Sequence, residues 1–419
     1  MIYIHIPFCR SFCTYCDFYS EVAARCRKAE DAQEQEAMFG RFAGALVSEI
    51  GLRADEITDE TNTLYIGGGT PSVLPLCVYE RILEALKEAG HGGPYDEFTV
   101  EVNPEDIVDK GEAYVKGLLA LGVNRISMGV QSFDDGILKF MNRRHDSETA
   151  RKAYAILEDA GVENISIDLI FGLPQLSDAQ WQETLEQALS ISGSGALPKH
   201  ISSYQLSVEP GSMLAKLVER GKWEEASEDL CQRQYGMLCE ALQKAGYRHY
   251  EISNFALEGY EAKHNSAYWR HVPYAGFGPG AHSFQIHSQT LCAPVAPSHK
   301  WAPPPTRGWE NATSAHQALG DDRRCFRQWN EPDLNKYIED PAGCREGEEL
   351  TDEQMVIERI MLALRTSEGI SEAYLREHCD QHELSRALAA GNLESVENGM
   401  LRIPESRFFI SDSIIASLI

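Results

Sequence analysis

Short runs of β-branched and aromatic residues alternate with longer amphipathic stretches from the start of the chain to about residue 255. Each run has the length of a strand, and the intervals between runs are long enough for a helix. The predicted strands are residues 2–6, 63–66, 97–102, 125–129, 165–170 and 200–206. Amphipathic segments at 81–87, 110–120 and 148–160 supply predicted helices between them. Repeated strand–helix units predict parallel strands joined by helical crossovers.

Chemically distinctive residues follow these predicted strands directly. They are the cysteine run at 9–16, GGGTP at 67–71, EVNP at 101–104, GVQSF at 129–133 and DLIFGLP at 168–174. In barrels the carboxyl ends of all strands face one mouth, whereas an open doubly wound sheet concentrates its site at one switch point. The pattern therefore favours an incomplete barrel of six strands over an open sheet.

The composition and periodicity of the sequence change after Phe284. Residues 285–320 are rich in Pro, Ser, Ala and His and lack periodicity, which indicates a loop or insertion. A helical pattern begins after Leu350, where Thr351 and Gln354 form a capping box. Strand-like runs at 400–403 and 407–410 then suggest a winged-helix-like module. The predicted domains are residues 1–284, 285–345 and 346–419.

The charge of the chain argues against several classes of partner. With 38 basic and 64 acidic residues the formal charge is −26, which disfavours binding to nucleic acid or to anionic lipid. The first residues contain no basic segment followed by a long apolar one, and no window reaches the roughly 18 apolar residues of a membrane span. We therefore expect a cytoplasmic protein without a membrane span.

Three of the eleven cysteines lie together as CRSFCTYC, at Cys9, Cys13 and Cys16. An iron–sulfur cube takes thiolate ligands, and three local cysteines would leave one iron without a protein ligand. An open position on a metal centre can bind a small molecule directly. Zinc is the weaker alternative, because the chain has no second cysteine pair at the usual spacing. The spacing predicts one 4Fe–4S cluster.

Glycines and polar residues at the later strand ends predict a ligand pocket beside these cysteines. The GGGTP run allows a backbone to approach a ligand closely. Glu101 and Asn103 end the third predicted strand, where burial of two polar groups is unfavourable without a partner. Gln131, Arg143 and Asp168 lie at or near later strand ends and converge on the same mouth.

Taken together, these motifs resemble the radical SAM superfamily, which uses S-adenosylmethionine (SAM), and within it the oxygen-independent coproporphyrinogen III oxidase-like family. The resembling stretches, in order, are MIYIHIPFC, LYIGGGTPS, EVNP, RISMGVQSF, DLIFGLP, HISSYQLSVEPG, YEISNFA and HNSAYW. The resemblance implies an α/β fold, a partial (β/α)6 radical SAM barrel with a C-terminal winged-helix-like domain. It also implies a 4Fe–4S cluster on the three cysteines, with SAM bound at its open iron. The implied cofactor-binding residues are Tyr3, Tyr15, Gly68, Gly69, Thr70, Glu101, Gln131, Arg143 and Asp168. For the last three the alternatives are a second SAM, a role in pocket shape, or haem propionates.

Two kinds of protein share these motifs, and two positions favour one of them. The oxidase has a fourth cysteine two residues after the third, where this chain has Phe18, and the haem-chaperone members have phenylalanine there and an HNxxYW motif. The chain therefore resembles the haem-chaperone branch, with His264, Asn265, Tyr268 and Trp269 as its haem-binding residues. Because a lone histidine among aromatic residues is usually a core residue, other histidines stay open as ligands, among them His5, His145, His249 and His282.

The leading hypothesis is thus a haem-binding protein that carries a cluster and SAM and delivers haem to acceptor proteins, including membrane respiratory enzymes. A flavodoxin or ferredoxin would supply electrons. The first alternative is an enzyme that decarboxylates the propionates of coproporphyrinogen III to vinyl groups. The second is another radical transfer, such as methylation, on a different small substrate. We expect a chaperone rather than an enzyme.

Overall fold

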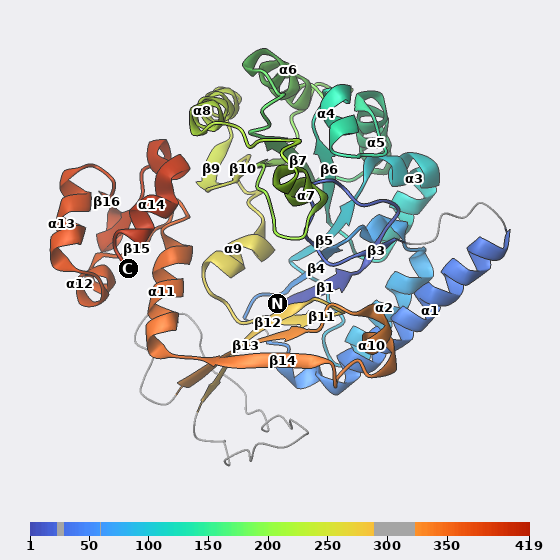
Figure 1. Ribbon diagram of the computed structural model, residues 1–419. Coiled ribbons are helices and arrows are strands. Elements are labelled where there is room, and N and C mark those ends of the chain that lie inside the picture. The colour runs from blue at the N-terminus through green and yellow to red at the C-terminus, as the bar shows by residue number, and fades with distance from the viewer. Residues whose placement is uncertain (23–28, 59, 289–322) are drawn as a thin grey trace.

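The computed structural model of the chain describes residues 1–22, 29–58, 60–288 and 323–419. Within these residues a curved nine-stranded sheet has the strand order β11–β1–β4–β5–β6–β7–β8–β10–β9 (Figure 1). The strands are β1 (Ile2–Ile6), β4 (Thr63–Gly68), β5 (Glu97–Val102), β6 (Arg125–Gln131), β7 (Ile165–Phe171), β8 (His200–Gln205), β9 (Arg248–Glu251), β10 (Asn254–Ala256) and β11 (Ala275–Phe277).

Six consecutive strands, β1 and β4 to β8, pair in parallel, which confirms the partial (β/α)6 barrel. Strand β11 extends the sheet in parallel beside β1, and β10 and β9 extend the other edge in antiparallel fashion. The edge strands β11 and β9 do not pair with each other in the part of the chain that is described, so the barrel is open.

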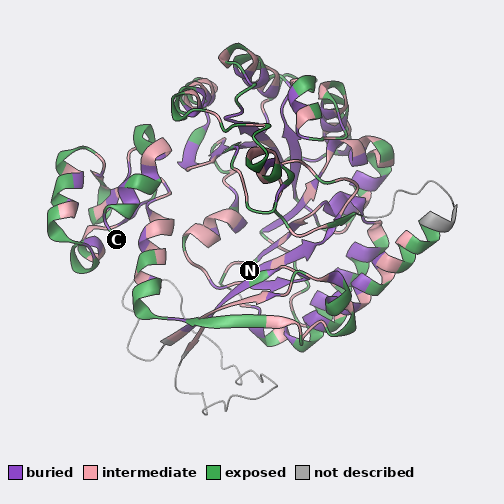
Figure 2. Cartoon of the chain, viewed as in Figure 1, coloured by how far each residue is buried: buried purple, intermediate pink, exposed green. Residues whose placement is uncertain are grey.

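Helices cover the outside of the sheet because each crossover must bury its apolar stripe against the strands. The main ones are α1 (Ala29–Leu52), α2 (Leu76–Glu88), α3 (Pro104–Ala120), α5 (Ser147–Ala160), α6 (Asp178–Leu189) and α8 (Glu228–Lys244). Figure 2 shows buried strands inside a ring of helices whose outer faces are exposed. None of the helices in the described residues is long and apolar enough to cross a membrane.

A second sheet of three antiparallel strands lies against the open side of the barrel, in the order β12–β13–β14. Its elements are β12 (His282–Ser288), β13 (Arg323–Asn330) and β14 (Arg345–Leu350), with α10 (Leu334–Glu339) between the last two. Regular structure within 285–345 was not expected from the sequence. Its charged strands, such as REGEEL of β14, carry no apolar alternation from which to predict them. Most of the Pro-rich run at 285–320 lies outside the described residues.

The C-terminal residues form a group of short helices with a small sheet, beside β9 and β10 (Figure 1). The elements are α11 (Asp352–Ala363), β15 (Ile370–Ser371), α12 (Glu372–His378), α13 (Gln381–Ala389), β16 (Glu394–Val396), β17 (Met400–Arg402) and α14 (Ser411–Ala416). The Thr351–Gln354 capping box at the start of α11 is confirmed.

The strand predicted at 407–410 is wrong, because Glu405–Ile410 form a 3-10 helix. The turn starts where Arg407 N–H donates to the Pro404 carbonyl at 2.7 Å, and Phe408 is buried against the ring of His249. The division of the chain into domains at 284 and 345 stays a prediction.

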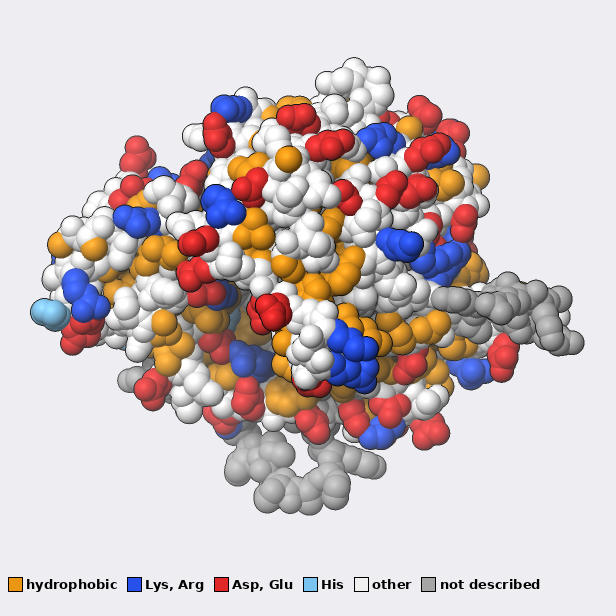
Figure 3. Space-filling model, turned by 45° about the horizontal axis from the view of Figure 1, so that its top comes forward, with side chains coloured by type: hydrophobic (Ala, Val, Ile, Leu, Met, Phe, Trp, Pro, Cys, Tyr) orange, Lys and Arg blue, Asp and Glu red, His pale blue; other side chains and the backbone are white. Residues whose placement is uncertain are grey.

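Charged side chains of both signs are spread over the face seen in Figure 3, with hydrophobic side chains gathered near its middle. The exposed large hydrophobic residues include Phe12 and Phe18 of the cysteine loop and Met213.

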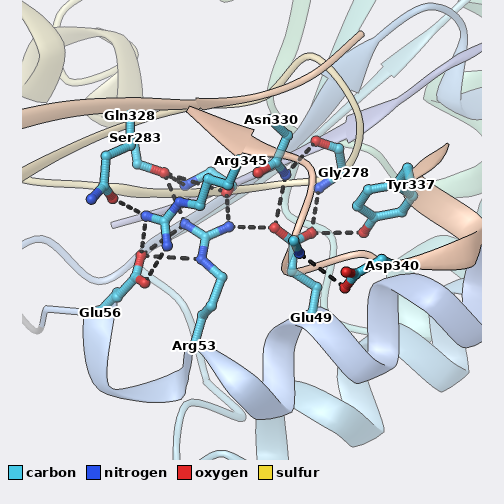
Figure 4. Close-up of polar contacts among 12 residues, drawn as sticks. Glu49, Arg53, Glu56, Gly278, Ser283, Gln328, Asn330, Tyr337, Asp340 and Arg345 are labelled. Atoms are coloured by element: carbon cyan, nitrogen blue, oxygen red, sulfur yellow. Dashed lines mark hydrogen bonds and ion pairs between the residues drawn. The ribbon is translucent and has the colours of Figure 1, made fainter. Parts of the chain in front are cut away.

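A buried ionic network joins α1 to the second sheet (Figure 4). The carboxylate of Glu49 accepts hydrogen bonds from Arg53, from Asn330 Nδ2 at 2.7 Å, from Gly278 N–H at 2.8 Å and from Tyr337 OH at 2.7 Å. Glu56, in the short 3-10 helix that follows α1, is paired with Arg53 and Arg345. Both carboxylates are therefore fully compensated, as buried charges must be to be tolerated.

We predict that Glu49→Leu lowers the free energy of unfolding by about 3–5 kcal/mol, because it leaves three neutral donors without their acceptor and leaves Arg53 to share Glu56 with Arg345 as its carboxylate partner. Denaturant unfolding followed by circular dichroism measures this. Lys152→Ala, which breaks an exposed ion pair with Glu148 on α5, is the matched control and should change stability too little to resolve. Equal effects of the two substitutions would show that the network does not stabilise the fold.

Candidate functional site

A cavity of about 480 Å³ opens where the parallel strands end at their carboxyl side. The predicted residues that line it are Cys9, Cys13, Tyr15, Cys16, Gly68, Gly69, Thr70, Glu101, Gln131, Arg143, Asp168 and Asn265. The fold thus brings together residues from the cysteine loop, from the strands β4 to β7 or the positions just after them, from the turn that carries Arg143 and from the segment of Asn265. Their individual roles stay predictions.

Backbone hydrogen bonds hold the cysteine loop on two neighbouring elements. Thr14 N–H donates to Met141 O at 3.1 Å, just after α4 (Asp135–Phe140), and Asn142 Nδ2 donates to Phe12 O at 2.6 Å. On the other side Leu214 N–H, in the first turn of α7 (Met213–Glu219), donates to Thr14 O at 2.8 Å. The loop is therefore positioned by tertiary contacts as well as by its own sequence.

A chain of side-chain hydrogen bonds connects two of the three cysteines. Thr70 Oγ1 donates to Cys9 Sγ at 3.4 Å, and Asn103 Nδ2 donates to Thr70 Oγ1 at 3.2 Å. Arg143 then bridges the other end, with Nη2 on Asn103 Oδ1 at 2.6 Å and Nη1 on Cys13 Sγ at 3.4 Å. Donors aimed at sulfur stabilise its thiolate form, and such contacts tune the metal that the thiolate binds.

The residues fit a site-differentiated 4Fe–4S cluster by the chemistry of their donor set. Three thiols line the cavity, and no fourth cysteine is among the described residues around it. Burial raises the pKa of the Cys16 thiol to about 12, so binding of a metal there releases a proton. Within the described ranges, no group of three or more His, Cys, Asp or Glu side chains is arranged so that it could hold a metal ion.

The glycine run after β4 passes directly over the strand that leads to Cys9. Gly69 N–H donates to Ile6 O at 2.8 Å, and a Cβ on Gly69 would lie 2.7 Å from Phe8 O. Gly68 has a left-handed φ of 106°, and its N–H donates to Glu101 Oε2 at 3.0 Å. Only glycine permits both features, which explains the run in physical terms.

Glu101 is the main titratable group of the cavity. Tyr65 OH donates to its Oε1 at 2.6 Å, and burial raises the pKa of the carboxyl group to about 7. A carboxylate held in this way is suited to a cationic ligand such as an ammonium group, which would lower its pKa again.

Gln131 is the last residue of β6, and Asp168 lies in the middle of the neighbouring strand β7. Gln131 has a φ of 67°, unusual for a residue other than glycine, at a bulge between β6 and β7. Backbone strain of this kind concentrates at functional sites. The hydroxyl of Ser127 donates a hydrogen bond that is shared between the two carboxylate oxygens of Asp168, each 3.3 Å from Oγ, and burial raises the pKa of this carboxyl group.

Four predicted ligand-binding residues do not line the cavity, namely Tyr3, His264, Tyr268 and Trp269. The hydroxyl of Tyr3 bonds His5 Nδ1 at 3.0 Å, and His5 Nε2 bonds Tyr19 O at 2.8 Å. Burial lowers the pKa of His5 to about 4. The ring is therefore neutral, with its proton on Nε2, and Tyr3 is the donor to Nδ1. Tyr3 thus orients His5, and His5 in turn holds Tyr19 at the end of the cysteine loop.

His264 is fully buried on α9 (Lys263–Trp269), at the opposite end of the barrel from the mouth. Its Nδ1 lies 2.9 Å from Thr63 Oγ1 and its Nε2 lies 3.1 Å from Tyr268 OH, so both ring nitrogens are engaged. Burial lowers the pKa of the imidazole to about 3. Within HNSAYW, Asn265 is the residue that reaches the cavity.

Sequence reasoning missed several polar residues of the cavity wall. Arg125 and Ser127 on β6 and Ser202 on β8 line it together with Tyr65. The signal was present in β6, where Arg125, Ser127, Gly129 and Gln131 alternate with apolar residues and so share one face.

Comparisons with known proteins agree with this geometry. Residues 3–188 match the Radical SAM superfamily. Heme chaperone HemW of Synechocystis sp. is 32% identical over 387 residues, 92% of this chain and 82% of that protein. Heme chaperone HemW of Lactococcus lactis is 38% identical over 282 residues, 67% of this chain and 69% of that protein. The solved structure of coproporphyrinogen III oxidase (HemN) from Escherichia coli has the same fold, with a TM-score of 0.71 at 20% identity, covering 99% of this chain and 89% of that one.

The chain is therefore a radical SAM protein, and this class implies a 4Fe–4S cluster and S-adenosylmethionine. Within the superfamily it belongs to the HemW family.

We predict that replacing Cys9, Cys13 and Cys16 with alanine abolishes iron and sulfide binding after anaerobic reconstitution, because no other thiol reaches the cavity among the described residues. Iron and acid-labile sulfide are assayed together with the visible spectrum. Cys77→Ala, which removes an exposed thiol on α2, should leave the iron content unchanged. Full iron and sulfide in the triple variant would contradict the cluster assignment.

Substitution of Glu101 should change stability in a pH-dependent way. Because its folded pKa of about 7 exceeds its ordinary value, the wild type without SAM loses about 3 kcal/mol of stability as the pH rises from 5 to 8. Glu101→Gln cannot ionise, so its stability relative to wild type should increase over that range while SAM binding weakens. Unfolding at pH 5.5 and pH 8 measures this, with exposed Glu88→Gln as the control. If the difference in unfolding free energy between the variant and wild type is the same at both pH values, the raised pKa of Glu101 is contradicted.

Proposed function

We propose that this protein is a haem chaperone that binds haem and passes it to acceptor haem proteins, and that it holds a 4Fe–4S cluster and SAM. Likeness over 92% of the chain to a protein named Heme chaperone HemW carries the proposal. Phe18 also supports it, because this residue stands where a fourth cysteine would be expected in the oxidase. Phe18 lies at the edge of the cavity and is 64% exposed. The proposed location is the cytoplasm.

In this proposal Cys9, Cys13 and Cys16 hold three irons of the cluster. When bound, the cluster and SAM supply one-electron chemistry at the sulfonium centre. Glu101 and the backbone of Gly68 and Gly69 receive the methionyl ammonium group, and Tyr15 and Thr70 border the same space. Arg143 fixes the cysteine loop through Cys13 and Asn103, a role that does not require it to touch SAM.

The proposed haem residues are His264, Asn265, Tyr268 and Trp269. His264 reaches a haem iron only after it leaves Thr63 and Tyr268, since both of its nitrogens are engaged. Haem binding through His264 therefore includes a movement of α9. Acceptor haem proteins, including membrane respiratory enzymes, and a flavodoxin or ferredoxin as electron donor are the proposed partners.

A second candidate function is the oxidative decarboxylation of coproporphyrinogen III. The shared fold with HemN and the presence of Gln131, Arg143 and Asp168 in the cavity favour it. An anaerobic assay of the reconstituted protein with SAM and coproporphyrinogen separates the two functions. Tight haem binding without decarboxylation is expected, and formation of protoporphyrinogen over many turnovers would establish the enzyme instead.

We predict that His264→Ala weakens haem binding about tenfold or more and shifts the Soret band, because an axial ligand is lost. Thr63→Val, which frees Nδ1 of His264 and keeps the imidazole, is the matched variant and should bind haem at least as tightly as wild type. Absorbance titration with haem measures both. An unchanged spectrum and affinity in His264→Ala would exclude His264 as the ligand.

A further inference from the structure

The interior of the barrel is polar from its mouth to its floor. Barrels of this kind usually fill the interior with branched apolar side chains. Here the inward face of β6 carries Arg125, Ser127, Gly129 and Gln131, all of which line the cavity. Polar groups buried in this way need partners, and Ser127 has one in Asp168.

Arg125 is a residue of the cavity whose side chain lacks such a partner. Its side chain is 2% exposed, and it makes neither a hydrogen bond nor an ion pair with any of the described residues. Its Nε atom in particular is buried without a partner. A guanidinium group stays charged in proteins. The nearby charges of Glu97 and Asp168 raise the pKa of Arg125 against the effect of burial, but no hydrogen bond satisfies its Nε atom.

The polar neighbours of Arg125 are engaged elsewhere. Glu97 accepts the backbone N–H groups of Lys263 and His264 at 2.7 and 3.0 Å and so caps α9. Asp168 accepts from Ser127. His200 bonds Ser166 and Tyr250, at 2.8 and 2.7 Å. Rearrangement of any of these groups toward Arg125 would leave another buried group without a partner.

The position of Arg125 separates it from the predicted SAM residues. It is the first residue of β6, whereas Gln131 is the last, and six residues of strand span about 20 Å. Asn265 of α9 lines the cavity as well and contributes an amide to it. Arg125 therefore lies at the floor, and the cysteines lie at the mouth.

We propose that Arg125 forms a carboxylate-binding subsite at the floor of the barrel, below the SAM site. A carboxylate matches the planar fork of a guanidinium group and can accept two parallel hydrogen bonds from it. Burial raises the pKa values of Glu101 and Asp168, so these groups can take up a proton when an anion enters. The carboxylate belongs either to a propionate arm of a porphyrin or to a small free acid. The subsite itself does not depend on the haem-chaperone proposal.

The test compares Arg125→Met with Arg53→Met in the full chain. Arg53 is equally buried but is paired with Glu49 and Glu56, so its removal should lower the melting temperature. Removal of Arg125 should leave the melting temperature of the ligand-free protein unchanged or raise it. Sodium propionate should raise the melting temperature of wild type, and in Arg125→Met its affinity should fall about tenfold or more. SAM affinity should stay within about twofold of wild type.

Titrations with haem and with haem dimethyl ester, which has no free carboxylate, show which molecule supplies the carboxylate that Arg125 binds. If Arg125→Met weakens haem binding but not ester binding, the carboxylate is a porphyrin propionate. If it weakens only propionate binding, the ligand is a small free acid. Failure of wild type to bind haem would contradict the chaperone function and leave the propionate result standing. The subsite is excluded if propionate has no effect on wild type, if Arg125→Met and Arg53→Met destabilise equally, or if SAM affinity falls as far as propionate affinity.

Discussion

The site depends on one buried carboxylate, that of Glu49. A partial barrel has an open side, and its edge strand β11 and the loop after it need support from outside the sheet. Glu49 provides that support, because its carboxylate accepts hydrogen bonds from Gly278, Asn330 and Tyr337 and so joins them to α1. These contacts fix the loop after β11 against the first strand of the barrel.

The same loop reaches the cysteines through close packing. A Cβ on Gly278 would lie 2.4 Å from His5 O, and one on Gly280 would lie 3.3 Å from the Cβ of Tyr19. Tyr19 ends the segment that carries the three thiols, and its hydroxyl accepts Leu334 N–H of α10 at 2.7 Å. Residues more than 300 positions later in the sequence therefore help to set where the cysteine loop lies.

Local patterns predicted much of this structure. Each of the six parallel strands was found, because a strand buried on both sides reads as a short run of β-branched and aromatic residues. The cysteine loop and the glycine run were found because their chemistry is contained in a few adjacent residues. The capping box of α11 was found for the same reason.

The features that escaped prediction depend on distant contacts. The connection from Cys9 to Cys13 through Thr70, Asn103 and Arg143 joins four separate segments, and no spacing in the sequence encodes it. The motif HNSAYW identified α9 as important, but the sequence could not reveal that His264 faces Thr63 and Tyr268. The apolar residues at 407–410 were interpreted as a strand, although burial of Phe408 against His249 favours a tight helical turn.

Helix α9 is fastened from two directions, and this has a consequence for shortened chains. Glu97 and Thr63 hold it from the barrel, while Arg270 and His271, just beyond its end, pair with Glu368 and Glu358 of the C-terminal region. A homologue that stopped before α11 would keep the three cysteines of the site and every strand of the nine-stranded sheet, but it would lose the contacts that hold the outer end of α9. Water could then enter the barrel at the amino ends of its strands, where α9 lies. Such a protein would need another segment there to exclude water from a radical intermediate.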